Sequence, residues 1–186
     1  MDFLERISQL TKISEEVLDH ARSQLEFFRF KKGDVLLSAG RVCNYMYFIN
    51  SGIVRGYYLT EKKDITNSIG LSGDVITSLY SFITRNPAHE SLECIEDCNI
   101  QAISHSRLLQ LYDRFPEIER AGRLILEGYY ARLEERVISI QFKSAKERYD
   151  HLFQTRPELI RLVPLGYLAS YLGMTQETLS RTRSEL

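Results

Sequence analysis

The spacing of hydrophobic positions changes along the chain, and each change predicts a different kind of secondary structure. Within residues 14–27 the apolar side chains recur at helical spacing, which predicts an amphipathic helix that begins at Ser14. Residues 27–103 are rich in Val, Ile, Phe and Tyr and contain glycines at short intervals, a pattern typical of short strands joined by tight turns. Clear strand-like segments are 45–49, 53–59, 65–71 and 91–95. Together they predict an all-β barrel or jelly roll.

Helical spacing returns after Ser104. We expect a short helix over 106–112, before Pro116, and then one long helix over 117–142, which contains no proline. Apolar residues in the long helix alternate at intervals of four and three, the spacing of a coiled-coil seam. The seam consists of Leu126, Tyr130, Leu133, Val137 and Ile140. It predicts a homodimer, and the alternative is a single helix packed on its own barrel.

The order of these elements predicts an α+β chain of two domains joined by the long helix. We assign residues 1–115 to the β-barrel domain, 116–142 to the dimerisation helix and 143–186 to an all-α domain. Within the last domain a helix is expected over 144–154, ended before Pro157.

Residues 164–183 read PLGYLASYLGMTQETLSRTR, the most specific pattern in the chain. A helix-turn-helix needs two short helices that cross closely. Leu168, Leu172 and Leu179 are apolar where these helices would face each other and the core, and Ala169 is small where they would pack most closely. The pattern therefore predicts a helix-turn-helix, and the alternative is an ordinary helical hairpin.

The predicted turn has the residue types that its geometry requires. Gly173 allows a positive φ at the corner, and Met174 plugs that corner. Thr175 is placed to cap the second helix, and Pro164 stands near the start of the first, where a missing N–H has little cost. Thr182 departs from the pattern, because an apolar residue would pack inward better there.

The second helix exposes side chains that can read DNA bases. Gln can bond adenine, Arg can bond guanine through two hydrogen bonds, and Glu can accept from cytosine. The predicted DNA-binding residues are Thr175, Gln176, Glu177, Ser180, Arg181 and Arg183. The net charge of residues 143–186 is +2, against −3 for the rest, and the basic residues Lys143, Lys146 and Arg148 could at most touch phosphates. Double-stranded DNA is the expected partner.

Overall composition narrows the class of protein. The 186-residue chain has a net charge of −1, so DNA binding must come from a local surface. No apolar run approaches the ~20 residues that span a bilayer, and the charged N-terminal segment is not a signal peptide, so we expect no membrane association. Three cysteines without a secretion signal fit a reducing cytoplasm, and Cys94 and Cys98 are interpreted as buried structural residues.

With these motifs in view, the whole chain resembles the Crp/Fnr family of transcription regulators. The resemblance rests on FKKGDVLLSAG (30–40), YMYFINSG (45–52), GDVITSLYSF (73–82) and GMTQETLSR (173–181). It implies a cyclic-nucleotide-binding fold in the sensor domain and a homodimer on a two-fold symmetric DNA site. It also implies base contacts from Gln176, Glu177 and Arg181, a small-molecule effector, and RNA polymerase as a further partner.

The chain departs from the family pattern in the effector pocket, which the resemblance places at Gly73, Asp74, Ser78, Leu79, Glu90 and Ser91. In members that bind cyclic AMP, a Glu bonds the ribose and an Arg holds the phosphate. Here Ser78 stands at the position of that Glu and Glu90 at the position of that Arg. A carboxylate repels a phosphate and lacks the two donors of Arg. We therefore expect no control by cyclic AMP, and a pocket that is empty or takes a ligand of unknown identity that is not an anion.

We expect no cofactor and no metal. A cubane iron–sulfur cluster normally takes four Cys ligands, and the three candidate haem ligands, His89, His105 and His151, are scattered in polar settings. An enzyme is not expected either, because the chain has no phosphate loop, metal-ligand cluster or nucleophile elbow. The remaining alternative is a cyclic-nucleotide-binding-like signalling module without DNA-binding activity, which would have no use for the C-terminal motif.

Overall fold

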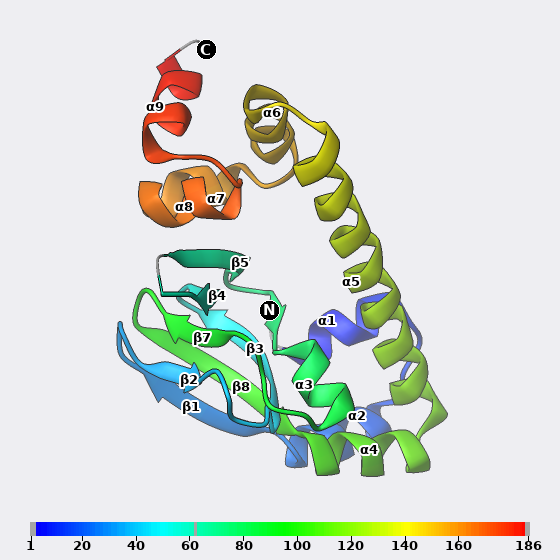
Figure 1. Cartoon of the computed structure of the whole chain (residues 1–186). Helices are drawn as coiled ribbons and strands as arrows, with labels where there is room; N and C mark the ends of the chain where they lie inside the picture. The colour runs from blue at the N-terminus through cyan, green and yellow to red at the C-terminus, as the bar shows by residue number, and fades with distance from the viewer. Residues whose placement is uncertain (1–2, 62, 185–186) are drawn as a thin grey trace. The chain divides into compact units, whose positions relative to one another are not determined.

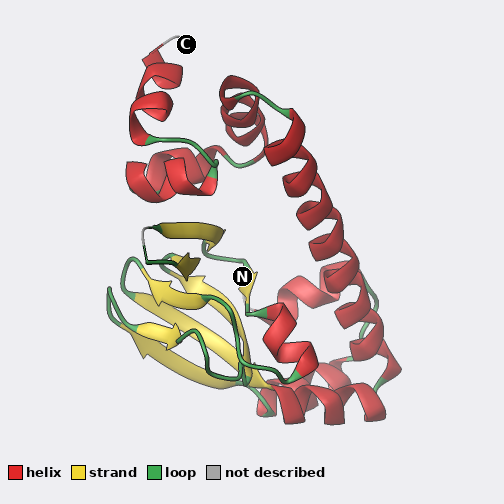
Figure 2. Cartoon of the chain, in the orientation of Figure 1, coloured by secondary structure: helices red, strands yellow, loops and turns green. Residues whose placement is uncertain are grey.

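The structure is a computed structural model that describes residues 3–61 and 63–184. It divides into two compact units, the first formed by Met1–Gly56 with Ile69–Glu127 and the second by Tyr57–Ser68 with Gly128–Leu186. Strands belong to the N-terminal part of the chain, and the part after residue 104 is helical (Figure 1, Figure 2). Glu185, which contributes to the charge count above, lies outside the described residues.

Within the described residues, eight strands form two four-stranded sheets. The first sheet has the order β1 (Glu26–Phe30), β8 (Cys98–Ser104), β3 (Tyr45–Ser51), β6 (Val75–Ile76). The second has the order β2 (Val35–Leu37), β7 (Ser91–Cys94), β4 (Val54–Leu59), β5 (Asp64–Gly70). The four segments predicted as strands correspond to β3, β4, β5 and β7. The predicted jelly roll is confirmed, in the form of two sheets rather than one closed barrel.

The core of the first unit comes from the inward-facing residues of these strands. Ile49 of β3 stands opposite Ile100 of β8 in the antiparallel register, and both are almost completely buried. Leu92 of β7 and Val54 of β4 contribute the same kind of side chain from the other sheet. Burial of each such aliphatic side chain stabilises the fold by about 1.5–3 kcal/mol.

Helices accompany the sheets in this unit. The predicted helices appear as α2 (Glu15–Ser23) and α4 (His105–Arg114), and α3 (Leu79–Thr84) follows β6. The first helix, α1 (Phe3–Leu10), was missed from the sequence. It buries Phe3, Leu4 and Ile7 on one face, a stripe that is too short to stand out as periodic.

The long helix α5 (Pro116–Phe142) confirms the predicted stretch and begins at a proline, which is tolerated in a first turn. The second unit continues with α6 (Ala145–Thr155), α7 (Pro157–Leu162), α8 (Leu165–Tyr171) and α9 (Gln176–Ser184). Ser144 caps α6 in a reciprocal pair of hydrogen bonds with Glu147. We did not predict α7, because Pro157 was interpreted as the end of a helix, whereas it occupies the first position of a new one. In the described part of the chain, no helix is long and apolar enough to cross a membrane.

Candidate nucleic-acid interface and effector site

The corner between α8 and α9 has the geometry of a helix-turn-helix. Gly173 adopts a φ of +66°, and the N–H of Met174 donates to the Ala169 carbonyl oxygen at 3.0 Å, which closes the end of α8. The hydroxyl oxygen of Thr175 accepts from the N–H of Thr178 at 3.2 Å and so caps α9. The turn therefore uses the residues that the sequence pattern assigned to it.

The two helices bury the predicted apolar positions. Leu168 and Leu179 are completely buried, and Ala169 is 1% exposed between them. Thr182 also faces inward, and its hydroxyl donates to the Thr178 carbonyl oxygen at 2.9 Å. A local hydrogen bond thus satisfies the polar group that the sequence pattern marked as out of place.

The opposite face of α9 is open to solvent. The six residues predicted to bind DNA are all exposed: Thr175, Gln176, Glu177, Ser180, Arg181 and Arg183. Hydrogen bonds from the Thr175 side chain and from its own backbone N–H hold the pKa of Glu177 below its usual range. Its carboxylate is therefore a hydrogen-bond acceptor at neutral pH.

Gly166 of α8 is a functional candidate that sequence reasoning missed. A Cβ at this position would lie 2.8 Å from the side-chain nitrogen of Gln176. The Gln176 amide therefore lies directly over α8, and any side chain at position 166 would displace it. The signal was present in the sequence as a glycine inside a helix, where glycine costs about 1 kcal/mol relative to alanine.

Two arginines attach the helix-turn-helix to its neighbours in the second unit. Arg148 of α6 donates to the carbonyl oxygens of Lys143 at 2.8 Å and Gly173 at 3.3 Å. Arg136 of α5 donates to the Tyr171 carbonyl oxygen at 2.9 Å, and its guanidinium lies 4.2 Å from the centroid of the Tyr171 ring. We predicted Arg148 only as a phosphate contact, and in the structure it holds the turn.

The predicted dimer seam is exposed along α5. Its five residues have exposed fractions between 43% and 65%: Leu126, Tyr130, Leu133, Val137 and Ile140. A row of large apolar side chains in water is unfavourable, so a second surface that covers this row would be stabilising.

The predicted effector site is built around the turn between β5 and β6. Gly73 adopts a φ of +91°, and the Asp74 carboxylate accepts from the N–H of Leu71 at 2.9 Å. Backbone hydrogen bonds attach both residues to Ile49 of β3, and the Arg6 side chain donates to the Gly73 carbonyl oxygen. The Gly-Asp turn is thus firmly fixed to the sheet.

The residues predicted to hold a ligand include one buried polar group that is unsatisfied. Ser78 is completely buried, and its hydroxyl has no hydrogen-bond partner among the described residues. Glu90 is 9% exposed, so its carboxylate is one of the few charged groups buried in this unit. Leu79 is half-buried, and the Ser91 hydroxyl accepts from the N–H of Ala39 at 3.0 Å. No hydrogen bond among the described residues joins Ser78 to Glu90.

A buried ion pair in the second sheet was not predicted. The Arg55 guanidinium, with 4% of its side chain exposed, lies 3.1 Å from the carboxylate of Glu93. An arginine inside a strand-like apolar run was the available signal, but its partner lies on another strand. Because Glu93 already neutralises this charge, Arg55 does not replace the phosphate-binding Arg of the family pattern.

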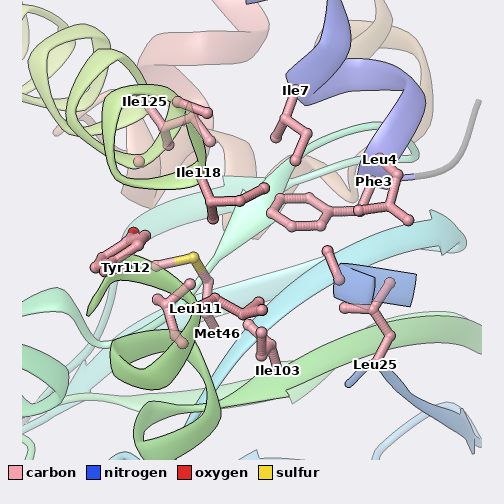
Figure 3. Close-up of a pocket in the computed structure, with 14 residues that line it drawn as sticks. Phe3, Leu4, Ile7, Leu25, Met46, Ile103, Leu111, Tyr112, Ile118 and Ile125 are labelled. Atoms are coloured by element: carbon pink, nitrogen blue, oxygen red, sulfur yellow. The ribbon is translucent and has the colours of Figure 1, made fainter. Parts of the chain in front are cut away.

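A cavity of about 30 Å³ lies elsewhere in the first unit (Figure 3). Its lining is almost wholly apolar, and it includes none of the predicted effector residues. The labelled side chains are Phe3, Leu4, Ile7, Leu25, Met46, Ile103, Leu111, Tyr112, Ile118 and Ile125. A volume of this size holds no more than a few atoms. We therefore interpret it as a packing gap.

The described residues contain no cluster of His, Cys, Asp or Glu that could hold a metal ion. Cys43, Cys94 and Cys98 are free thiols, and all three are buried, which confirms the predicted burial of Cys94 and Cys98.

The fold and the two sites define a class: a cyclic-nucleotide-binding-like sensor followed by a helix-turn-helix. Residues 27–115 match the family model of the cyclic nucleotide-binding domain. This match and the relatives described below show that the chain is similar to transcription regulators of the Crp/Fnr family.

Curated relatives and solved structures agree with this assignment. The chain is 28% identical to the fumarate and nitrate reduction regulatory protein of Yersinia pestis, and the match covers 94% of this chain and 76% of that protein. It is 27% identical to the Escherichia coli K12 protein of the same name, with the same coverage of each chain. Among solved structures, FixK2 from Bradyrhizobium japonicum matches with a TM-score of 0.75 at 22% identity, covering 87% of this chain and 84% of FixK2. The catabolite activator protein of Thermus thermophilus matches with a TM-score of 0.61 at 19% identity, covering 95% and 85%. These structural likenesses concern the fold.

Proposed function

We propose that this chain is a homodimeric regulator that binds double-stranded DNA by placing α9 in the major groove. One observation carries the proposal: α9 buries Leu179 and Thr182 against the motif while six polar and charged side chains face solvent. Arg181 and Gln176 are assigned to base edges, because their side chains match guanine and adenine. The positively charged last turn of α9 suits the phosphate backbone.

Selection of bound sequences from random DNA tests this proposal directly. We expect enrichment of a two-fold symmetric sequence whose half-sites are about one helical turn, or about 34–36 Å, apart. A matched variant, Arg181→Ala, should lose the enrichment while remaining folded. A folded wild-type chain that enriches no sequence would leave only the signalling module without DNA binding.

The dimer is assigned to the exposed seam of α5. Placing Glu at both Leu133 and Val137 should give monomers in light scattering at micromolar protein, because charges would be buried against each other. Ile138 offers a matched control, since it is equally exposed but falls outside the heptad seam. Ile138→Glu should remain dimeric, and a dimeric double variant would show that the seam is misassigned.

The effector of this regulator is not cyclic AMP. The buried Glu90 carboxylate supports this, because an anionic phosphate beside it would be repelled. We assign residues 1–115 to the sensor, 116–142 to dimerisation and 143–186 to DNA binding, in a cytoplasmic protein whose further partner is RNA polymerase. Calorimetry with cyclic AMP and cyclic GMP at millimolar ligand should give no binding isotherm, and a micromolar dissociation constant for either nucleotide would contradict the assignment.

A further inference from the structure

The side chain of Ser170, near the end of α8, bonds to the backbone of β5. Its hydroxyl oxygen accepts from the N–H of Thr66 at 2.9 Å, and the hydroxyl donates to the Asp64 carbonyl oxygen at 3.3 Å. Thr66 is completely buried. Residues 57–68, which include the turn between β4 and β5, belong to the same compact unit as α8, so this contact lies inside the second unit.

The two backbone groups that bond Ser170 lie on an edge strand. β5 is the last strand in the order of the second sheet, so one side of its backbone faces away from the other described strands. Along a strand, the carbonyl oxygen of one residue and the N–H two residues later point to the same side. A hydroxyl can donate and accept at once, so one serine bonds both groups. Ser170 therefore contacts β5 as a residue of a further strand would, and covers part of its edge.

Three consecutive residues of α8 contact three different parts of the second unit. Ala169 is buried where α8 packs on α9, Ser170 bonds β5, and Tyr171 contacts Arg136 of α5. Consecutive residues of a helix are roughly 100° apart around its axis, so these contacts reach α8 from different sides. The position of α8 is thus fixed by β5 as well as by its helical neighbours.

The contact with β5 leaves the surface assigned to DNA uncovered. The six predicted DNA-binding residues are all exposed while Ser170 is bonded to β5. Leu168 of α8 and Leu179 of α9 are completely buried in the core that the two helices share, so a contact that fixes α8 also fixes the direction of α9. The bonds to β5 are therefore compatible with DNA binding and orient the helix that would perform it.

We propose that Ser170 is a positioning residue for DNA recognition, because its two bonds to β5 hold α8, and through it α9, in one orientation. This role rests on the proposed DNA binding, whereas the bonds themselves do not. A dimer that binds two half-sites at a fixed distance needs both recognition helices in a defined orientation. Without the hydroxyl each α9 gains orientational freedom, and ordering it again on DNA costs binding free energy.

Amide hydrogen exchange of the full chain, followed by NMR, tests the bonds without DNA. In Ser170→Ala the N–H of Thr66 loses this acceptor, so its exchange should be at least about tenfold faster than in the wild type. The N–H of Lys63 is a matched control, because it donates to the Thr60 hydroxyl at 3.0 Å within the same turn. Its exchange should not change. Ser170→Thr keeps the hydroxyl and should keep the exchange of Thr66 slow.

Gel-shift titrations test the positioning role, on the selected DNA and on versions in which the half-site spacing differs by one base pair. The wild type should prefer one spacing. Ser170→Ala should bind that spacing about threefold or more weakly and lose most of the preference, because its recognition helices are less well oriented. Ser170→Thr should behave like the wild type. Thr155→Ala, which removes a hydroxyl that bonds the His151 carbonyl oxygen within α6 at 2.8 Å, serves as the control.

The proposal is overturned if Thr66 exchanges equally fast in the wild type and in Ser170→Ala, or if folded Ser170→Ala keeps both the affinity and the spacing preference of the wild type. Tighter DNA binding by Ser170→Ala would also contradict it, because β5 would then restrain the helix-turn-helix. A wild-type chain that binds no DNA would overturn the proposed function and the positioning role together, while the exchange rates would still establish the bonds.

Circular dichroism verifies the folding of each variant. If Ser170→Ala unfolds, Ser170→Cys under a reducing agent replaces it, because a thiol has a similar size but is a weak donor and acceptor. It should then show the faster exchange of Thr66 and the reduced spacing preference, and wild-type values for both would overturn the proposal.

Discussion

The helix-turn-helix and the effector site both depend on a glycine with a positive φ, Gly173 at +66° and Gly73 at +91°. Near Gly173 the buried Leu172 and Leu179 are apolar, and the hydroxyl of the buried Thr182 has a local hydrogen-bond partner. Around Gly73 the turn is equally well bonded, but the buried Ser78 hydroxyl has no hydrogen-bond partner among the described residues, and Glu90 places a carboxylate in a buried position.

This difference distinguishes the residues that fix the backbone of each site, which we call its frame, from the residues that would contact a ligand. In the helix-turn-helix, the residues that fold the motif also set the direction of the residues that we assign to DNA. In the effector site, the frame of the turn is retained while the ligand positions have changed chemistry. A family frame is therefore a better guide to fold than to ligand.

The largest loss of stability is expected from a core residue of α9, the helix that both folds the motif and is assigned to DNA. Leu179→Ala removes a completely buried side chain between the two helices and should lower the free energy of unfolding of the second unit by about 2–5 kcal/mol. Ser180→Ala, on the exposed face of the same helix, should change it by less than about 0.5 kcal/mol. Urea titration followed by circular dichroism measures both, and equal values would mean that α9 is not packed as described.

A substitution on the exposed face of α9 should weaken DNA binding without affecting the fold of the helix-turn-helix. Arg181→Ala should weaken binding to the selected DNA by about 1–3 kcal/mol per half-site and leave binding to random DNA nearly unchanged, because only a guanine contact is lost. Lys146→Ala, which removes an exposed charge on α6, should weaken both alike and lower the salt slope by about one. Gel-shift titrations at several salt concentrations separate the two patterns. Equal loss on both DNAs for Arg181→Ala would place that side chain on the phosphate backbone.

The effector site should bind cyclic AMP if the Glu and the Arg of the family pattern are restored. The double substitution of Ser78→Glu and Glu90→Arg installs the ribose and phosphate anchors of the cyclic-AMP pattern. Calorimetry should then give a dissociation constant for cyclic AMP that is at least about tenfold lower than that of the wild type, which corresponds to about 1.4 kcal/mol of binding free energy. Glu90→Gln, which removes the charge without adding a donor, should gain much less. A folded double variant with no gain would mean that the frame of this site has changed as well.

The smallest effect is expected at the one polar residue buried in the helix-turn-helix. Thr182→Val removes a hydroxyl whose acceptor, the Thr178 carbonyl oxygen, keeps the backbone partner it has in a helix. The melting temperature should rise slightly, corresponding to about 1 kcal/mol or less, because the buried hydroxyl no longer needs a partner. Destabilisation of more than this would show that the hydroxyl is needed where it is.

Local patterns explain which features were predictable. The cap at Thr175, the turn at Gly173 and the buried positions of α8 and α9 follow from residues within one short segment, so the sequence pattern placed each of them. The alternation of short strands likewise predicted the jelly roll. The seam on α5 was read from a single helix, and its role stays a prediction.

Contacts between distant segments explain what was missed. Arg55 meets Glu93 across two strands, so this pair depends on β4 and β7 lying side by side in the second sheet. Neither partner is visible from periodicity. Helix α7 was missed for a different reason, because a proline that ends one helix can also begin the next.

The contact of Arg136 with Tyr171 has a mechanical consequence. Arg136 precedes the seam residue Val137 on α5, and it contacts both the ring and the carbonyl oxygen of Tyr171 in α8. If two copies pack along the seam, a small rotation of one α5 about its axis turns α8 through the Arg136 contact. Helix α9 then moves with α8, because α8 and α9 share a buried core. The stiffness of this one side chain would then set how much of a twist at the dimer axis reaches the surface that meets DNA.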